Sequence, residues 1–159
     1  MASPRILVTD RARSAMVTVA RNILLSAMRE LGLEGRELSL LLTLNGEIQE
    51  LNKRFRGIDK STDVLSFPMD DDLLLGDIAI SMDMVREQAL EARCRPEVEL
   101  ARLCHHGLLH LLGYEHIHGG RQAARMRRKE EELFIALKAK GFLSDLAGSH
   151  QGSYSQGGE

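Results

Sequence analysis

Hydrophobic residues recur along this chain at two spacings, one typical of helices and the other typical of strands. Helical spacing runs over residues 12–31, after Asp10 as a candidate N-cap, and ends at Gly32. Leucines at positions 38, 40, 42 and 44, separated by Ser39, Leu41 and Thr43, instead predict a strand with one buried face. Short β-prone segments predict three more strands, at residues 5–9, 64–67 and 76–80.

Capping residues and periodicity predict three helices in the middle of the chain. Asn45 is a candidate N-cap for a helix that Gly57 ends, and Ser81 is a candidate N-cap for a second. Pro96 opens the third, which is apolar on nearly every side. We therefore expect this third helix to be buried.

A last helix is predicted after Gly120, reaching about Lys140. The resulting order of elements predicts an α+β fold, in which a small mixed sheet of about four strands is covered by about five or six helices. The buried helix that carries the candidate metal-binding histidines is expected at its centre. The chain has 159 residues, 43% of them hydrophobic, which suits a single domain over residues 1–143. Residues 144–159 are rich in Ser, Gly and Gln, and we expect a disordered tail there.

Composition excludes several classes of protein. The net charge of −2 means that any nucleic-acid contact must come from a local basic patch. No apolar run approaches the roughly 20 residues of a membrane span, so we expect no membrane association. Cys94 and Cys104 lack metal-site or disulfide-framework spacing, which favours a reducing, cytoplasmic location. We also expect no organic cofactor.

Five of the six histidines lie within residues 105–118. His106 and His110 are four residues apart, so on a helix they share one face at a separation that suits a common metal ion. Gly113 is expected to end the helix and to let His116 return as a third ligand. Three imidazoles would leave one position of a tetrahedral zinc ion open for water or substrate. His118 is the alternative third ligand, and His105, which points to another face, is expected beside the ligands or on the surface.

The spacing of these histidines equals that of the metzincin proteases, H-E-x-x-H-x-x-G-x-x-H, but Gly107 replaces the glutamate that serves as the base. The sequence therefore predicts a metal hydrolase whose substrate is not a peptide. A glycine within a helix costs about 1 kcal/mol relative to alanine. Something is therefore expected to approach the backbone of Gly107 closely, and substrate is one candidate.

Three charged segments have open roles. Residues 53–60 form a basic region, in which Arg54 and Lys60 are the candidate RNA contacts and Arg56 is the candidate catalytic residue. The acidic residues 70–72 are interpreted as a solvated turn, with a second metal site as the alternative. The arginines of residues 121–128 are interpreted as an exposed helical face, with an RNA contact as the alternative.

The chain resembles the YbeY endoribonucleases, which mature bacterial ribosomal RNA. The most specific part is HGLLHLLGYEH at residues 106–116, followed by TDVLSFP at 62–68 and GDIAIS at 76–81. The family usually has aspartate where this chain has Glu115, and the tail lies outside the family pattern. Further pieces of the resemblance are Leu51-Asn52, Arg56-Gly57, Gln88-Ala89 and the pair Met126 and Glu130.

The resemblance implies a single-strand-specific, metal-dependent endoribonuclease. It would act in the maturation of the 3′ end of 16S rRNA and in late quality control of the 70S ribosome, with ribosomal RNA and the ribosome or its small-subunit proteins as partners. It also implies one zinc ion held by His106, His110 and His116, and a functional arginine at Arg56.

Chemistry supports such an activity without a protein base. Zinc lowers the pKa of bound water toward about 7, and an arginine can pair with phosphate oxygens through two hydrogen bonds. The attacking group, zinc-bound hydroxide or the RNA 2′-hydroxyl, stays open, as does the native metal. Three alternatives remain: a metzincin-like zinc protease, a non-catalytic ribosome-assembly factor stabilised by zinc, and a metal sensor or store.

Overall fold

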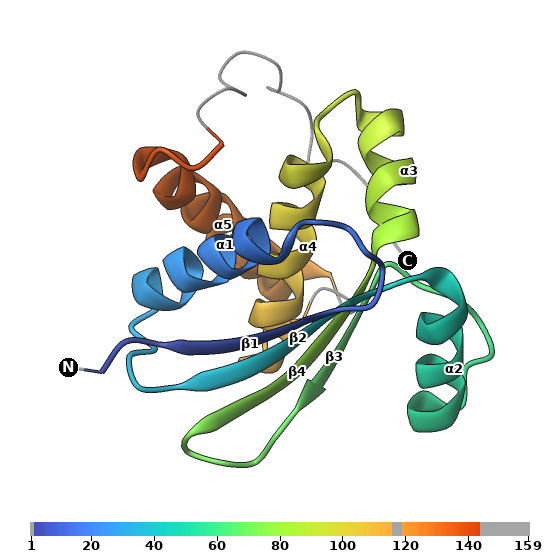
Figure 1. The fold of residues 1–159 in the computed structure, drawn as a ribbon. Helices are drawn as coiled ribbons and strands as arrows, with labels where there is room; N and C mark the ends of the chain where they lie inside the picture. Colours follow the sequence, from blue (N-terminus) through green and yellow to red (C-terminus); the bar gives the residue numbers. More distant parts are fainter. Residues whose placement is uncertain (1, 116–118, 144–159) are drawn as a thin grey trace.

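The computed structural model describes residues 2–115 and 119–143. His116, His118 and the tail at 144–159 therefore lie outside the described residues. Within these ranges the chain forms an α+β fold of four strands and five helices, in the predicted order (Figure 1). The elements are β1 (Arg5–Asp10), α1 (Val17–Glu30), β2 (Glu37–Thr43), α2 (Asn45–Arg56), β3 (Val64–Pro68), β4 (Leu74–Ser81), α3 (Met82–Ala92), α4 (Pro96–Leu111) and α5 (Gly120–Ala139).

The four strands form one mixed sheet in the order β1-β2-β4-β3. The β1–β2 and β2–β4 pairs are parallel, and β3 pairs with β4 in the antiparallel direction at one edge. Since β3 and β4 are consecutive, a short loop joins them, whereas the parallel pairs need the longer crossovers that contain α1 and α2. The predicted mixed sheet is therefore confirmed.

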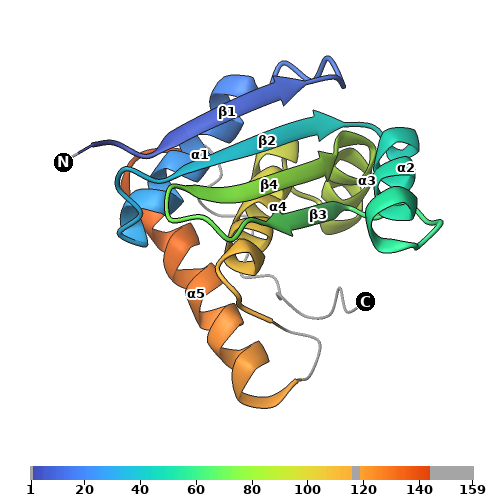
Figure 2. The ribbon, with the colours of Figure 1, turned by 90° about the horizontal axis from the view of Figure 1, so that it is seen from below.

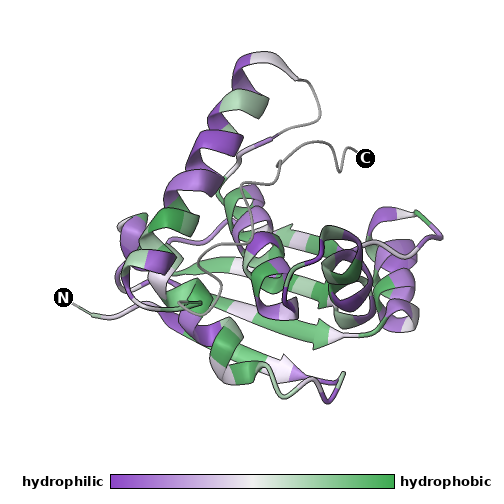
Figure 3. Ribbon diagram, turned by 90° about the horizontal axis from the view of Figure 1, so that it is seen from above, coloured by the Kyte–Doolittle hydropathy of each residue, from purple (hydrophilic) through white to green (hydrophobic). Residues whose placement is uncertain are grey.

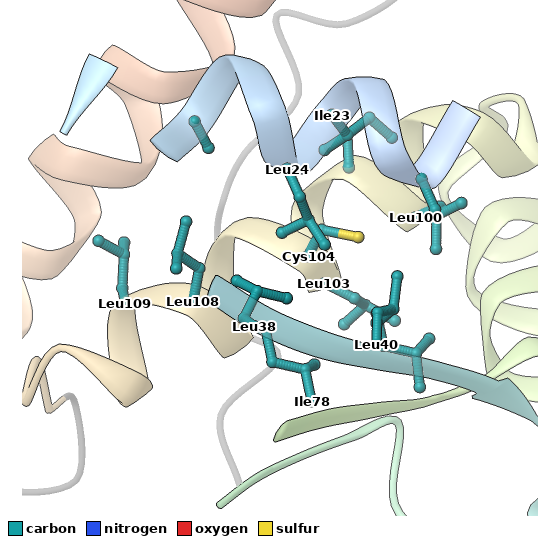
Figure 4. Close-up of a cluster of buried hydrophobic side chains, with 14 of the residues drawn as sticks. Ile23, Leu24, Leu38, Leu40, Ile78, Leu100, Leu103, Cys104, Leu108 and Leu109 are labelled. Atoms are coloured by element: carbon teal, nitrogen blue, oxygen red, sulfur yellow. The ribbon is translucent and has the colours of Figure 1, made fainter. Parts of the chain in front are cut away.

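One face of the sheet carries the main core. The alternation predicted for residues 38–44 places Leu38, Leu40 and Leu42 on this face, where they are almost fully buried. Helices α1, α4 and α5 cover them, and Ile78 joins from β4 (Figures 1 and 4). Cys104 of α4 is part of the same cluster. The helix predicted to be central and buried is therefore the helix that fills this core.

The opposite face of the sheet is mostly open (Figure 2). Among the residues that the structure describes, only α2 packs on it, at one end, where Ile48 joins Leu65 and Ala79 in a small second cluster. Leu7, in the middle of β1, is 61% exposed on this side. The helices therefore cover mainly one face of the sheet. Hydrophobic alternation within single strands did not predict this for the whole sheet. Within the part of the chain that the structure describes, no helix has the length and apolar character needed to cross a membrane.

Two of the predicted N-caps are wrong. The Asp10 carboxylate accepts hydrogen bonds from the backbone N–H groups of Ala12 and Ser14, and α1 begins only at Val17. Asn45 is the first residue of α2, and its side-chain oxygen accepts a hydrogen bond from Ser81 at 2.6 Å. In both cases the polar side chain binds another partner, which removes it from capping.

The other predicted helix ends are confirmed. Ser81 caps α3, because its Oγ accepts a hydrogen bond from the N–H of Met84 at 3.2 Å. Gly57 ends α2 in the left-handed conformation, with φ of 70°. Pro96 opens α4 as expected.

Candidate functional site

The predicted histidine pair meets at the carboxyl-terminal half of α4. His106 and His110 are one turn apart on a partly exposed face of this otherwise buried helix. Their Nε2 atoms are 3.0 Å apart, and their ring centroids are 4.5 Å apart. The local geometry of a helix is sufficient to bring these two nitrogens together.

Glu130 on α5 contacts the first of these rings. Its carboxylate lies 3.1 Å from Nδ1 of His106, and the two side chains are 12% and 22% exposed. Because a carboxylate accepts hydrogen bonds, Nδ1 carries the hydrogen and Nε2 of His106 keeps its lone pair. The sequence connected Glu130 with the family pattern but gave no sign of this contact.

The arrangement fits a bound zinc ion. Two nitrogens at about 2.0–2.1 Å from a tetrahedral ion are about 3.3 Å apart, close to the observed separation of the Nε2 atoms. A ligating histidine usually donates its other ring N–H to a carboxylate, as His106 does to Glu130. The described residues contain no group of three His, Cys, Asp or Glu side chains that could hold a metal. His116, the predicted third ligand, is not among them.

Gly107 lies between the histidines and faces the sheet. A Cβ atom there would be 2.9 Å from Cγ2 of Ile78 and 3.2 Å from Cγ2 of Val64. Ser66 also donates a hydrogen bond to the Gly107 carbonyl at 2.9 Å. The expectation that substrate approaches this glycine is therefore wrong: β3 and β4 are its neighbours. The same contacts leave no room for the metzincin glutamate at this position.

His105 is buried, so the surface placement considered for it is wrong. Its ring is 1% exposed and lies edge-on to Phe134, with centroids 6.3 Å apart. Burial lowers the pKa of His105 to about 4, although the negative charge of Glu130 opposes the shift. His105 is therefore neutral at physiological pH and belongs to the core, behind the site.

The predicted RNA contacts lie on the other side of β3. Arg54 and Arg56 are at the exposed carboxyl-terminal end of α2, and Lys60 is in the loop that follows. The Arg54 guanidinium lies 5.8 Å from the ring centroid of Phe55. Because α2 packs on the open face and α4 on the covered face, the edge strand β3 lies between these cations and the histidines.

The acidic loop behaves as a turn. The Asp71 carboxylate accepts hydrogen bonds from the N–H groups of Leu73 and Leu74, at 2.7 and 2.9 Å. These two bonds, that of Leu74 first, lower the pKa of Asp71. The interpretation as a turn is therefore confirmed.

The arginines of the last helix are exposed as predicted. The first half of α5 is strongly hydrophilic, while Met126, Leu133 and Leu137 pack into the core (Figure 3). Arg125 lies over the ring of Tyr114, 5.0 Å from its centroid. The exposure of this helical face is confirmed, and a contact of its arginines with RNA stays a prediction.

An ionic network next to the histidines was not predicted. Arg102 is one turn before His106 on the same side of α4, and it forms an ion pair with the nearly buried Glu99. Arg102 also donates to Gln88 at 3.3 Å, and Gln88 donates to Asp63 at 3.4 Å. The network links α4 to α3 and to the start of β3. Only the i, i+3 spacing of Glu99 and Arg102 could have indicated part of it.

Comparisons with known proteins agree with this fold. The sequence model of the family described as endoribonuclease YbeY matches residues 8–138. The chain therefore belongs to the endoribonuclease YbeY family, and the resemblance noted in its sequence is confirmed.

Individual relatives extend the match to most of both chains. The endoribonuclease YbeY of Aquifex aeolicus is 44% identical over 70% of this chain and 77% of its own. That of Sulfurihydrogenibium sp. is 39% identical over 84% of this chain and 92% of its own. A solution structure from Thermotoga maritima, 27% identical, superposes with a TM-score of 0.63 and covers 96% of this chain and 99% of its own.

Proposed function

We propose that this chain is an endoribonuclease that cuts ribosomal RNA during its processing. The observation that carries the proposal is the family match over residues 8–138, together with the convergent Nε2 atoms of His106 and His110. Its finer form is a single-strand-specific enzyme that matures the 3′ end of 16S rRNA and acts in late quality control of the 70S ribosome. Its partners would be the ribosome or small-subunit proteins, in the cytoplasm.

The proposed cofactor is one zinc ion, held by His106, His110 and His116. The support is the 3.0 Å separation of the two Nε2 atoms and the carboxylate on Nδ1 of His106. When bound, zinc would supply an acidified water and a Lewis acid for a phosphate oxygen. Glu130 contributes by keeping the hydrogen of His106 on Nδ1, so that Nε2 faces the site as a lone pair.

Arginine at position 56 is proposed to pair with phosphate oxygens of the RNA. Its guanidinium is exposed at the end of α2, where Arg54 and Lys60 add positive charge. With these cations on one side of β3 and the histidines on the other, the RNA strand would cross the edge of the sheet. Negative charge that develops on the attacked phosphate would thus meet fixed positive groups.

A cleavage assay tests the proposal. Single-stranded and double-stranded RNA of the same sequence are incubated with the protein, with and without a chelator, and zinc is then restored. We expect cleavage of the single strand only, lost with the chelator and regained with zinc. The His110→Ala protein, which keeps the surface charge, should be inactive. Cleavage by His110→Ala at the parent rate would refute the metal-dependent mechanism.

The same assay separates the alternatives. The RNA ends report the attacking group, since attack by the 2′-hydroxyl leaves a cyclic phosphate and attack by water does not. Casein in place of RNA tests a protease, which the packing of Gly107 against Ile78 disfavours. A zinc-stabilised but non-catalytic assembly factor would lose thermal stability with the chelator and cut no RNA.

A further inference from the structure

The open face of the sheet contains a groove next to α2. It has a volume of about 380 Å³ and is lined mainly by apolar atoms. That volume lies within the range of small-molecule sites. We define this sheet groove by five of its lining residues: Thr9, Leu41, Phe55, Phe67 and Asp77. The face that contains it is turned toward the viewer in Figure 2.

Two aromatic rings form one wall of the sheet groove. Phe55 from α2 and Phe67 from β3 meet edge to face, with centroids 5.5 Å apart and planes at 64°. Phe55 is 62% exposed, which is unusual for a ring beside an apolar groove. A flat ligand that stacked on this ring would remove its apolar surface from water.

The floor of the sheet groove carries one carboxylate. Asp77 is directly opposite Phe67 on the neighbouring strand and opposite Ser39 on the other side. It is half-buried, and within residues 2–115 and 119–143 its side chain makes no hydrogen bond or ion pair. A carboxylate in such surroundings favours a ligand that donates hydrogen bonds.

Two consecutive residues of β3 connect the sheet groove with α4, the helix that carries the histidines. Ser66 points to the covered face, where it binds the Gly107 carbonyl, and the next residue, Phe67, points into the groove. Successive strand residues face opposite sides, and β3 is the edge strand. A strand of RNA that crossed this edge would therefore meet both the groove and His106–His110.

We propose that the sheet groove binds one unpaired base of the RNA substrate and that guanine fits it best; this inference rests on the proposed function. The base would stack on Phe55. Asp77 would accept hydrogen bonds from N1–H and the 2-amino group, a pair of donors that only guanine among the four bases presents on one edge. Arg11, which also lines the groove, is paired with Glu47. The positive charge that would attract the RNA backbone is therefore that of Arg54, which lies over the Phe55 ring.

Binding measurements test the inference without needing cleavage. The full-length His110→Ala protein is titrated with single-stranded RNA that contains guanine, and with the same RNA containing inosine, which lacks the 2-amino group. We expect guanine RNA to bind roughly 10-fold more tightly. Adding Phe55→Ala should raise both Kd values roughly 10-fold. Because the Phe55 side chain is mostly exposed, the thermal unfolding of the Phe55→Ala protein should match that of the parent.

The Asp77→Asn substitution tests the hydrogen bonds. It should abolish the preference for guanine over inosine and favour xanthine, whose C2 carbonyl can accept from the new amide. Leu90→Ala and Glu91→Gln, on the exposed side of α3, are the matched controls and should change nothing. In the otherwise unchanged protein, Asp77→Asn should raise KM and leave kcat at the parent value.

Unchanged RNA affinity and base preference in both Phe55→Ala and Asp77→Asn would overturn the inference. If those variants instead lost self-association or binding to a protein partner, the groove would belong to that protein and the inference would be wrong. Failure of the parent to cut any RNA would refute the proposed function, while a guanine preference in binding would still support the groove.

Discussion

Glu130 contacts His106 across 24 positions of sequence, with its carboxylate 3.1 Å from Nδ1. The contact joins α5 to α4 and fixes which nitrogen of His106 faces the candidate ion site. The orientation of this ring therefore depends on how two helices far apart in sequence pack together.

Removal of that carboxylate should weaken zinc binding. We expect Glu130→Ala to lower zinc affinity about 10- to 100-fold, because the His106 ring loses the group that orients it. The zinc affinity of Glu130→Gln should lie between those of Glu130→Ala and the parent, since the glutamine amide oxygen still accepts a hydrogen bond. Calorimetric titration with zinc measures the effect, and the exposed Glu131→Ala is the control. Equal affinity in Glu130→Ala and the parent would contradict the role of this contact.

Gly107 is predicted to be intolerant of any side chain. In Gly107→Ala, the new methyl group would overlap Ile78 and crowd Val64, at a cost of about 1–3 kcal/mol, against about 1 kcal/mol gained in helix propensity. We expect a lower Tm in thermal unfolding. Gly46→Ala is the matched control, since nothing lies within 4 Å of its new methyl group in α2, and it should unfold at or above the parent Tm.

Arg56→Lys should lose most of the cleavage rate while fold and zinc content stay unchanged. Lysine keeps the charge but cannot form the two-pronged hydrogen bond to phosphate oxygens. Steady-state kinetics on single-stranded RNA measure the effect, with Arg29→Lys on the exposed side of α1 as the control. A change in KM alone would assign Arg56 to binding of phosphate, and a parent-like rate would remove it from the mechanism.

The two cysteines should differ sharply in reactivity. Burial raises the pKa of the fully enclosed Cys104 thiol far above its usual value. The pKa of Cys94 is also raised, by partial burial and then by the charge of Glu99. Since the thiolate is the reactive form, Cys94 should react slowly with a thiol reagent, faster as pH rises. Cys104 should react only after denaturation, and mass spectrometry would show modification of native Cys104 if this is wrong.

The sequence by itself determined the order and type of the elements. Hydrophobic spacing predicted about four strands, five or six helices and the burial of α4, because these depend on interactions between residues that are close in the chain. The separation of His106 and His110 was predictable for the same reason, as one helical turn sets it. Where local rules failed, at Asp10 and Asn45, a different polar partner competed for the capping side chain.

Only the tertiary structure decided what surrounds those elements. Its packing brought Glu130 to His106, placed Ile78 against Gly107 and left one face of the sheet open with Asp77 beside Phe67. These contacts join residues on separate elements, and the spacing of one element carries no information about which other element packs on it. The helical spacing of the histidines was therefore visible in the sequence, whereas their orientation and the path proposed for RNA depend on how helices and sheet pack together.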